Sequence, residues 1–198
     1  MNLILSTRNP SKALQIKALF DGSPLSVRTL ADAGIEGEAV EDGATLEENA
    51  AKKAWYAHEK SDKKSWTMAD DTGIFIDALG GEPGVYSARW AGDVSTEEIT
   101  RYTLQRLEDA TDRSATFRTV VVAVSPEGIE YTFAGEVRGT ILTAPRVPPQ
   151  PKMPYSPLFV PHGQDKVWAE MTTKEENAIS HRGIAFRKAR AFLEGLNR

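Results

Sequence analysis

The first twenty residues constrain the fold most, because they join a short apolar run, a tight loop and a helix. Asn2 to Ser6 has the length and apolar character of a short buried strand, and Thr-Arg-Asn-Pro ends it. Pro10 suits the first turn of a helix, where its missing N–H is not needed. From Ser11 to Phe20, apolar residues then recur at helical spacing, at Leu14, Ile16, Leu19 and Phe20. A strand that leads through a tight loop into a helix is typical of α/β proteins.

The same alternation continues along the chain, with a hairpin late in the sequence. Capping boxes at Thr45-x-x-Glu48 and Ser95-x-x-Glu98 start helices that are expected to end near residues 58 and 108. The remaining expected elements are strands at 26–30, 66–69 and 159–160, a hairpin of 116–124 with 130–138, and a last helix from 180 to about 196. This order predicts an α/β fold with a mixed sheet, without repeats or a linker between independent domains.

Composition narrows the classes of function. The net charge of −4 and the absence of a basic patch interleaved with aromatic residues argue against a nucleic-acid-binding module. The chain has no cysteine, which excludes disulfides, thiolate metal sites and a cysteine nucleophile. The N-terminus lacks the features of a signal peptide, and no apolar run approaches the roughly 20 residues that span a bilayer. We therefore expect a cytoplasmic protein that does not bind membranes.

The loop between the first strand and the first helix is a candidate phosphate site. A helix N-terminus presents unpaired N–H groups and a partial positive charge, and both favour phosphate. Lys12 and the hydroxyls of Thr7 and Ser11 would add donors. The loop has neither the Walker pattern nor the glycines of a dinucleotide fingerprint, so an ordinary capped loop is the alternative.

A second candidate is the Asp70-Asp71-Thr72-Gly73 segment, which follows the apolar run at 66–69. Ligands of α/β proteins bind at the carboxyl ends of strands. Two carboxylates there can bind Mg²⁺ through oxygen and accept a proton from water. The alternative is a solvated acidic turn.

Two further groups of charged residues are less specific. The acidic residues between 36 and 48 include Glu48, whose spacing to Lys52 predicts an ordinary i,i+4 pair, so most of them are expected on a solvated face. His181 and Arg182 lie near the start of the last helix, where Arg can bind phosphate or a base edge through two hydrogen bonds. The alternative for this pair is a surface position.

Taken in order, five motifs resemble the inosine triphosphate pyrophosphatase family, and they extend over nearly the whole chain. They are Thr7-Arg8-Asn9-x-x-Lys12, Glu48-Asn49-Ala50-x-x-Lys53-Ala54, Ala69-Asp70-Asp71-Thr72-Gly73, Gly81-x-Pro83-Gly84-Val85-Tyr86-Ser87-Ala88-Arg89 and Ser180-His181-Arg182-Gly183. The resemblance implies one domain over residues 1–198, with two α/β lobes around a long bent mixed sheet and a nucleotide cleft between them. It also implies a homodimer that hydrolyses triphosphates of deaminated purines, such as ITP, dITP and XTP, to the monophosphate and pyrophosphate.

The resemblance also implies roles for individual residues. Asp71 would be the general base and a ligand of Mg²⁺, Glu41 would supply another carboxylate, and Asp70 is a further candidate metal ligand. The residues implied to bind the triphosphate are Thr7, Arg8, Asn9, Ser11, Lys12, Lys53 and Thr72. The residues implied to lie near the base are Met153, Tyr155, Ser156, Glu176, His181 and Arg182.

The chain departs from the family pattern where that family reads the base. Met153 replaces a stacking aromatic residue and Ser156 replaces an aspartate, in a segment, 145–157, that holds six of the chain's eleven prolines. Glu176 stands where the family has a lysine. A lysine donates to a keto oxygen, whereas a carboxylate accepts from an amino group. If Glu176 faces the base, the preference for 6-keto purines should weaken; the alternative is that Glu176 points to solvent and Lys174 substitutes for it.

These features favour an enzyme with altered base choice over a catalytically weak nucleotide-binding or sensing protein. Asp71, Glu41 and Lys53 are all retained, and a protein that only binds nucleotides does not need a base directed at water.

Overall fold

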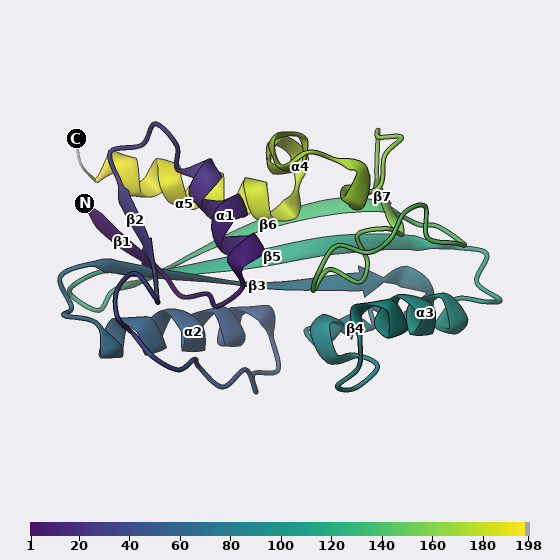
Figure 1. The fold of residues 1–198 in the computed structure, drawn as a ribbon, viewed down its shortest axis with the longest axis horizontal. Coiled ribbons are helices and arrows are strands. Elements are labelled where there is room, and N and C mark those ends of the chain that lie inside the picture. The colour runs from purple at the N-terminus through teal and green to yellow at the C-terminus, as the bar shows by residue number, and fades with distance from the viewer. Residues whose placement is uncertain (197–198) are drawn as a thin grey trace. The chain divides into compact units, whose positions relative to one another are not determined.

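The structure, a computed structural model, describes residues 1–196 and confirms a mixed α/β fold (Figure 1). The strands are β1 Asn2–Leu5, β2 Ser26–Thr29, β3 Trp66–Ile76, β4 Pro83–Gly84, β5 Ser114–Val124, β6 Glu130–Ile141 and β7 Phe159–Pro161. The helices are α1 Pro10–Leu19, α2 Leu46–Lys60, α3 Thr96–Arg106, α4 Thr173–Ile179 and α5 His181–Gly195, with 3₁₀ turns at Asp77–Leu79, Ser87–Arg89 and Trp168–Glu170. None of the helices in residues 1–196 combines the length and the apolar character that a bilayer span requires.

The strands form one mixed sheet with the order β2-β1-β3-β5-β6-β7, and β4 pairs with β3. β1 is parallel to both β2 and β3, whereas β4 and β7 are antiparallel to β3 and β6. The pairing of β1 with β3 ends at Leu5 opposite Met68, although β3 continues to Ile76. The strand edge beyond Met68 therefore extends past the end of β1, where the chain turns into α1.

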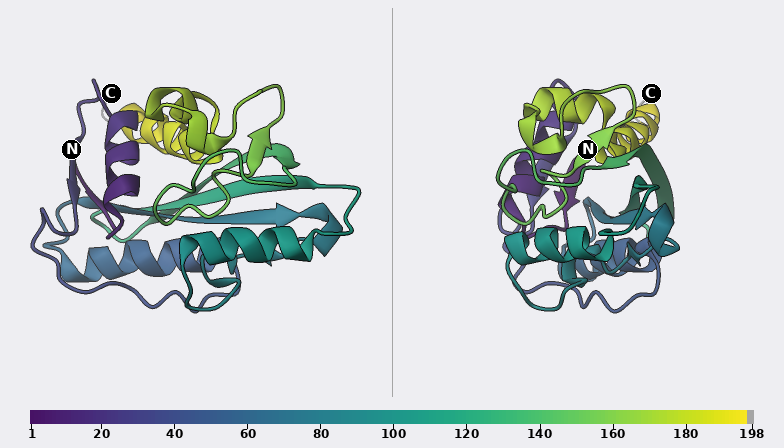
Figure 2. Two further views of the ribbon diagram at one scale, coloured as in Figure 1. Left: turned by 45° about the vertical axis from the view of Figure 1, so that its right-hand side comes forward. Right: turned by 90° about the vertical axis from the view of Figure 1, so that its right-hand side faces the viewer.

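The chain divides into two compact units. Among the described residues, unit 1 contains 1–71, 119–135 and 181–196, and unit 2 contains 72–118 and 136–180. In unit 1, α1 and α5 cover one face of the strands and α2 covers the other, as the views of Figure 2 agree. In unit 2, α3 lies on one face of its strands and α4 on the other.

Side-chain alternation along the strands of unit 1 separates two apolar layers. Leu3, Trp66 and Met68 pack in the core that includes Ile16 and Phe186 of α1 and α5. Ile4 points the other way and packs with a core that includes Ala57 of α2. Since successive side chains of a strand point to opposite faces, residues 66, 68 and 70 share the α1/α5 side, and residues 67, 69 and 71 share the α2 side.

Most of the predicted elements are confirmed, and their caps explain the boundaries. The side chain of Thr45 accepts from the N–H of Glu48 at the start of α2, and Ser95 and Glu98 form a reciprocal capping box at α3. The hairpin of β5 and β6 and the short strand β7 also lie where the sequence predicts them. Residues 145–157 form turns, with one isolated bridge between Gln150 and Met153.

Two expectations about the elements were wrong, and one helix was not predicted. β3 does not end at Ala69 but continues through Asp70–Gly73, so this segment is buried strand and not a solvated acidic turn. The buried face of α1 includes Gln15, while Leu14 is 72% exposed. Helix α4 was not predicted, although Thr172 and Glu175 form the same capping box that marks α3.

Gly135 of β6 allows α5 to approach the sheet very closely. A Cβ at this position would lie 2.2 Å from the carbonyl oxygen of His181 and 2.7 Å from the N–H nitrogen of Ala185. These are backbone atoms of the first turns of α5, which cannot move aside as a flexible side chain can. Gly135 therefore determines how closely the start of α5, with His181 and Arg182, packs against the sheet.

We predict that Gly135→Ala lowers the free energy of unfolding by about 1–3 kcal/mol, because an inserted methyl group has to displace α5. Urea denaturation measures the change. Gly195→Ala is the matched control, since a Cβ there meets no atom within 4 Å and no strain is expected. Equal effects of the two substitutions would contradict this view of Gly135.

Candidate functional site

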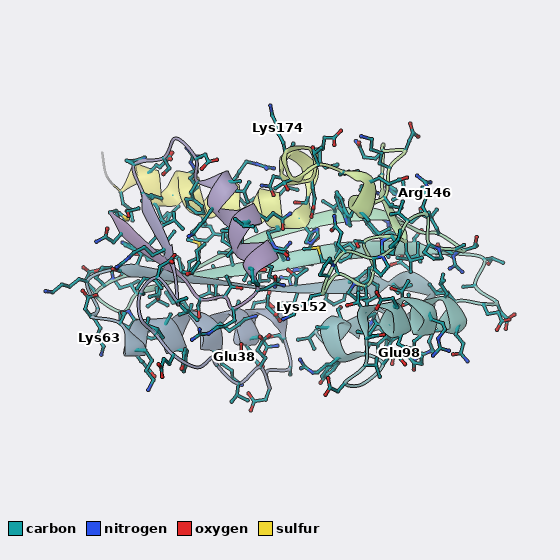
Figure 3. The ribbon with its side chains drawn as sticks, in the orientation of Figure 1. Glu38, Lys63, Glu98, Arg146, Lys152 and Lys174 are labelled. Atoms are coloured by element: carbon teal, nitrogen blue, oxygen red, sulfur yellow. The ribbon has the colours of Figure 1, made fainter. Side chains whose placement is uncertain are left out.

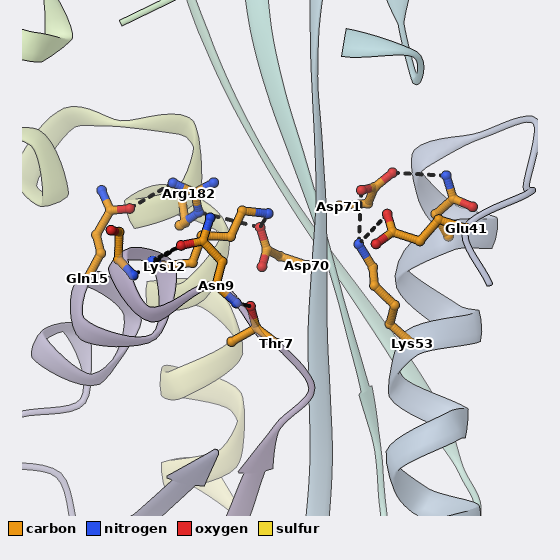
Figure 4. A network of polar contacts seen from close by, with 11 residues as sticks. Thr7, Asn9, Lys12, Gln15, Glu41, Lys53, Asp70, Asp71 and Arg182 are labelled. Atoms are coloured by element: carbon orange, nitrogen blue, oxygen red, sulfur yellow. Dashed lines mark hydrogen bonds and ion pairs between the residues drawn. The ribbon is translucent and has the colours of Figure 1, made fainter. Parts of the chain in front are cut away.

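The two consecutive aspartates of β3 point to opposite faces of the strand, and each meets cationic side chains there (Figure 4). We call the residues on the α1/α5 side the Asp70 cluster: Asp70, Lys12, Gln15 and Arg182. Those on the α2 side are the Asp71 cluster: Asp71, Lys53, Glu41 and Asn49. Alternation along the strand thus separates two carboxylates that the sequence places side by side.

In the Asp70 cluster, one carboxylate faces two cations. Asp70 Oδ2 lies 3.3 Å from Lys12 Nζ and 3.4 Å from Arg182 Nε, and Arg182 also donates to Gln15 Oε1 at 2.7 Å. The side chains of Asp70 and Arg182 are 3% and 6% exposed, so these charges interact in a low-dielectric environment. The three charged groups sum to +1, which makes this side of β3 suited to an anion.

The pKa values of this cluster follow from burial and from the neighbouring charges. Burial alone would raise the pKa of Asp70, but the positive charges of Lys12, Arg182 and Lys53 outweigh it and hold that pKa well below its usual range. Burial lowers the pKa of Lys12 despite the nearby carboxylate. Burial, and then the charge of Arg182, lower the pKa of His181 well below its ordinary value. His181 is therefore neutral at neutral pH.

In the Asp71 cluster, two carboxylates converge on one ammonium group. Lys53 Nζ lies 3.0 Å from Glu41 Oε2 and 3.0 Å from Asp71 Oδ1. Asn49 Nδ2 donates to Asp71 Oδ2 at 3.2 Å, so both oxygens of Asp71 are held. Asn49 and Lys53 are four residues apart on α2 and hence share one helix face. The charged groups sum to −1, which suits a cation.

Burial raises the pKa of Asp71, and the negative charge of Glu41 raises it further. The charge and hydrogen bond of Lys53 oppose this effect without cancelling it. Burial alone would lower the pKa of Lys53, but the carboxylates of Asp71, Asp70 and Glu41 raise it overall. Asp71 is thus the more basic carboxylate of the consecutive pair, and Lys53 is a firmly charged ammonium group.

The loop that leads into α1 differs in one respect from the sequence-based expectation. Asn9 caps the helix, and its Oδ1 accepts from the N–H groups of Ser11 and Lys12. Pro10 has no N–H, and the N–H of Ala13 is bonded to the carbonyl of Asn9. The first amides of α1 are consequently used within the protein, and the donors that remain for an anion are side chains, Lys12 foremost.

Arg8, which the sequence assigns to the triphosphate, has other partners in the structure. Its guanidinium group donates to the carbonyl oxygens of Ile35 and Gly37. Thr7 Oγ1 accepts from the N–H of Asn9 and thereby shapes the same loop. Thr72 follows Asp71 in β3 and is half-buried.

The residues expected near the base lie mainly in unit 2. The hydroxyl of Tyr155 donates to the carbonyl of Ser87 at 2.8 Å, and its ring packs edge-on against Phe117, so Tyr155 is a core residue. The hydroxyl of Ser156 donates to the carbonyl of Met153 and accepts from the N–H of Gln150, which stabilises the turn. The polar groups of both side chains therefore have structural partners, while Met153 is half-buried.

Glu176 and Lys174 occupy contrasting positions on α4. Glu176 is 8% exposed, whereas Lys174 is exposed and points away from the ribbon (Figure 3). The alternative in which Glu176 turns to solvent and Lys174 substitutes for it is therefore wrong. Arg182 was expected near the base, but its observed partners are Gln15 and Asp70.

Sequence reasoning missed two polar residues of these clusters. Asn49 positions Asp71, and Gln15 accepts from Arg182. Each is a buried amide on the inner face of a helix, and this is the signal that could have identified them. The expectation that Asp70 and Asp71 act on one metal ion does not fit the geometry, because Asp70 faces Lys12 and Arg182 on the opposite side of β3.

Known proteins resemble this chain over almost its whole length. Residues 3–192 match the Ham1 family. The chain belongs to the Ham1 family. The dITP/XTP pyrophosphatase of Thermoanaerobacter pseudethanolicus is 39% identical over 196 residues, covering 98% of this chain and 96% of that protein. The dITP/XTP pyrophosphatase of Geobacter sulfurreducens is 40% identical over 186 residues, 92% of each chain.

Solved structures agree with this assignment. The Staphylococcus aureus Ham1 protein superimposes with a TM-score of 0.84 at 32% identity, covering 98% of this chain and 99% of that one. A HAM1 protein from Coxiella burnetii superimposes with a TM-score of 0.85 at 29% identity, covering 98% of each chain. The fold of this chain is therefore that of Ham1 proteins.

We predict that Asp70→Asn lowers the free energy of unfolding by about 3–5 kcal/mol at pH 7, because it leaves the buried Arg182 and the partly buried Lys12 without their carboxylate. The fold holds the pKa of Asp70 below its unfolded value, so its contribution is fully present above about pH 4 and is lost as the pH falls through the lowered pKa. The difference in the free energy of unfolding between the variant and the natural protein should therefore decrease below pH 4. Urea denaturation between pH 7 and pH 3 measures it.

The exposed Asp62, whose carboxylate accepts from the N–H of Lys64, provides the control Asp62→Asn. This variant should remain within about 0.5 kcal/mol of the natural protein. If the difference in the free energy of unfolding between Asp70→Asn and the natural protein stays constant with pH, Asp70 is excluded as the buried counter-ion.

Proposed function

We propose that this chain hydrolyses the triphosphates of deaminated purines, namely dITP, XTP and ITP, to the nucleoside monophosphate and pyrophosphate with the help of Mg²⁺. As a Ham1-family member that matches dITP/XTP pyrophosphatases over almost its full length, the chain is a nucleoside triphosphate pyrophosphatase. The observation that carries the mechanistic part is the Asp71 cluster, in which a buried carboxylate of raised pKa is held by Asn49 and Lys53 next to Glu41.

The Asp71 cluster fits a divalent cation that prefers oxygen ligands. Glu41 and Asp71 both lie 3.0 Å from one ammonium group, so their oxygens already converge on a positive charge. Within residues 1–196 no group of three or more acidic or histidine side chains forms a complete metal cage. Mg²⁺ is commonly bound by one or two carboxylates together with substrate phosphates, and two carboxylates match that pattern. The ion, when bound, would neutralise charge on the phosphates.

The Asp70 cluster supports a role in binding the triphosphate. Lys12 and Arg182 exceed Asp70 by one positive charge, and Lys12 is the more accessible of the two cations, with 24% of its side chain exposed. The hydroxyls of Thr7, in the loop, and of Ser11, in the first turn of α1, lie on either side of Asn9, which caps that turn. We therefore assign Lys12, Thr7 and Ser11 to the triphosphate, with Lys53 and Thr72 completing the set.

Asp71 is assigned as the general base. A water molecule attacks the α-phosphorus, its proton passes to Asp71, and the bond from that phosphorus to the bridging oxygen breaks, so that pyrophosphate leaves. A carboxylate with a raised pKa accepts a proton more readily than an ordinary one, which suits this step. Phosphoryl chemistry depends on positioning and charge neutralisation, and the clusters on either face of β3 supply charges of both signs.

For the base, the proposal rests on the resemblance and on the relatives named for dITP and XTP. Met153 and Glu176 remain the assigned base-reading positions in unit 2, with His181 as a neutral hydrogen-bonding group in unit 1. We also propose that the chain acts as a homodimer, which light scattering on the purified protein tests.

We predict that Asp71→Asn lowers the rate of pyrophosphate release from dITP by about 10²–10⁴-fold, the usual contribution of a general base, while dITP binding survives. Pyrophosphate release with Mg²⁺ and calorimetric binding without turnover measure the two effects separately. Asp62→Asn is the control for a lost surface charge. Unchanged turnover in Asp71→Asn would remove Asp71 from this role, and no release from any triphosphate by the natural protein would favour a nucleotide-binding protein.

We predict that Glu176→Gln raises the ratio of kcat/KM for dITP over that for dATP by about tenfold, the effect of roughly one hydrogen bond. A glutamine amide donates to a keto oxygen, which a carboxylate cannot do. The measurement compares ITP, dITP, XTP, GTP and ATP and their deoxy forms in both proteins. Lys174→Gln, on the exposed side of the same helix, is the control, and a ratio that moves equally in both variants would rule out Glu176 as the base-reading residue.

A further inference from the structure

Arg8 lies in the loop before α1, but its side chain reaches a different loop. Its Nε donates to the carbonyl of Gly37 at 3.0 Å, and its Nη2 donates to the carbonyls of Ile35 at 2.6 Å and Gly37 at 2.9 Å. Arg8 is itself exposed, so this guanidinium group is held by specific geometry and not by burial. A planar fork of N–H donors can bind two carbonyls of one loop together, whereas an ammonium group acts as a point charge.

The loop that Arg8 holds is the one that carries Glu41. We call residues 35–45 the Glu41 loop. Near its start, the hydroxyl of Tyr56 donates to the carbonyl of Glu36 at 2.6 Å, so Arg8 and Tyr56 bind consecutive carbonyls from two different elements. Gly37 has a φ of +74°, and a Cβ there would lie 2.6 Å from the Tyr56 hydroxyl. The start of the loop is therefore fixed closely against both side chains.

The end of the Glu41 loop is anchored separately, on α2. The N–H of Gly43 donates to Asn49 Oδ1 at 2.8 Å, and the N–H of Ala44 donates to Glu48 Oε2 at 2.7 Å. Lys52 forms an ion pair with Asp42. This anchor belongs to the helix that also carries Lys53.

Glu41 lies between these two anchors, in a stretch without regular structure. Glu38, Val40 and Glu41 are exposed. The contact of the Glu41 side chain is with Lys53, and 42% of that side chain is exposed. Little apolar burial holds residues 38–41 in place, so the position of Glu41 depends on the two ends of its loop.

We infer that Arg8 is a positioning residue for Glu41, and that it acts through the Glu41 loop and not by contact with phosphate. It connects the loop of Thr7 and Asn9, just before α1, to the Glu41 loop, so that Glu41 is held in a fixed place at the cation site. The inference rests on the proposed function for the use of Glu41 as a metal ligand. The anchoring of the loop is independent of that function.

The test compares Arg8→Lys with Tyr56→Phe, because the two variants loosen the same loop from different elements. Arg101→Lys, at an exposed position of α3 in unit 2, is the control for replacing an arginine by a lysine. Hydrogen–deuterium exchange of residues 33–45 measures the loop itself. Binding of Mn²⁺, followed by its electron paramagnetic resonance signal with saturating α,β-methylene-ITP, measures the cation site, and calorimetry of that analogue in EDTA measures nucleotide binding without metal.

If Arg8 acts through the loop, both variants speed exchange in residues 33–45 and weaken Mn²⁺ binding by about three- to tenfold, the effect of about one lost hydrogen bond. Binding of the analogue in EDTA then changes less than about twofold. The inference would be overturned in favour of a direct phosphate contact by the following result. Arg8→Lys alone binds the analogue more weakly in EDTA, while Tyr56→Phe shows normal exchange and normal Mn²⁺ binding.

The exchange measurement keeps this test separate from the proposed function. Unchanged exchange in Arg8→Lys overturns the inference whatever the activity of the natural protein. Suppose instead that exchange is faster in Arg8→Lys, but that the natural protein neither binds Mn²⁺ nor releases pyrophosphate. That result would reject the proposed function, and with it the link from the loop to the metal.

Discussion

The arrangement of the site depends on one electrostatic constraint: two adjacent carboxylates are buried in a strand, and each requires a positive charge nearby. A buried ionised group without a partner is costly, and two like charges on the same face would raise that cost. β3 avoids this conflict because consecutive side chains point to opposite faces. Asp70 meets Lys12 and Arg182, and Asp71 meets Lys53. The result is an excess of positive charge on one side of the strand and of negative charge on the other, and the metal–triphosphate complex that we propose as the substrate would use both.

Much of the fold could be predicted from the sequence, because local signals specify most elements. Caps at Thr45 and Ser95 and the hairpin of β5 and β6 are encoded within a few residues. The end of β3 could not be predicted in this way, since aspartate is disfavoured in strands and Gly73 resembles a turn signal. The charge of Asp70 in the strand is balanced by Lys12 and Arg182, 58 and 112 residues away. The burial of Gln15 has the same origin, because its partner Arg182 is 167 residues away.

The candidate site was predicted more completely in its residue types than in its geometry. The motifs around Lys12, Lys53, Asp71 and Arg182 do supply the two clusters, but a linear motif does not say which face of an element a side chain occupies. Tyr155 illustrates the limit: the resemblance places it near the base, whereas its hydroxyl and ring belong to the core of unit 2. Asn49 shows the converse, since it belongs to one of the family motifs, yet the motif alone does not indicate that Asn49 donates to Asp71.

The cap formed by Asn9 has a consequence for the thermodynamics of binding. Because the Asn9 side chain accepts from the amides of Ser11 and Lys12, the first turn of α1 is complete before any ligand arrives. Ordering a loop around a phosphate costs conformational entropy at the moment of binding. Here that ordering belongs to the folding of the chain, so Lys12 extends from a helix that is already rigid. Affinity gained in this way comes from conformational entropy that the chain has already lost on folding, and not from an additional contact with the ligand.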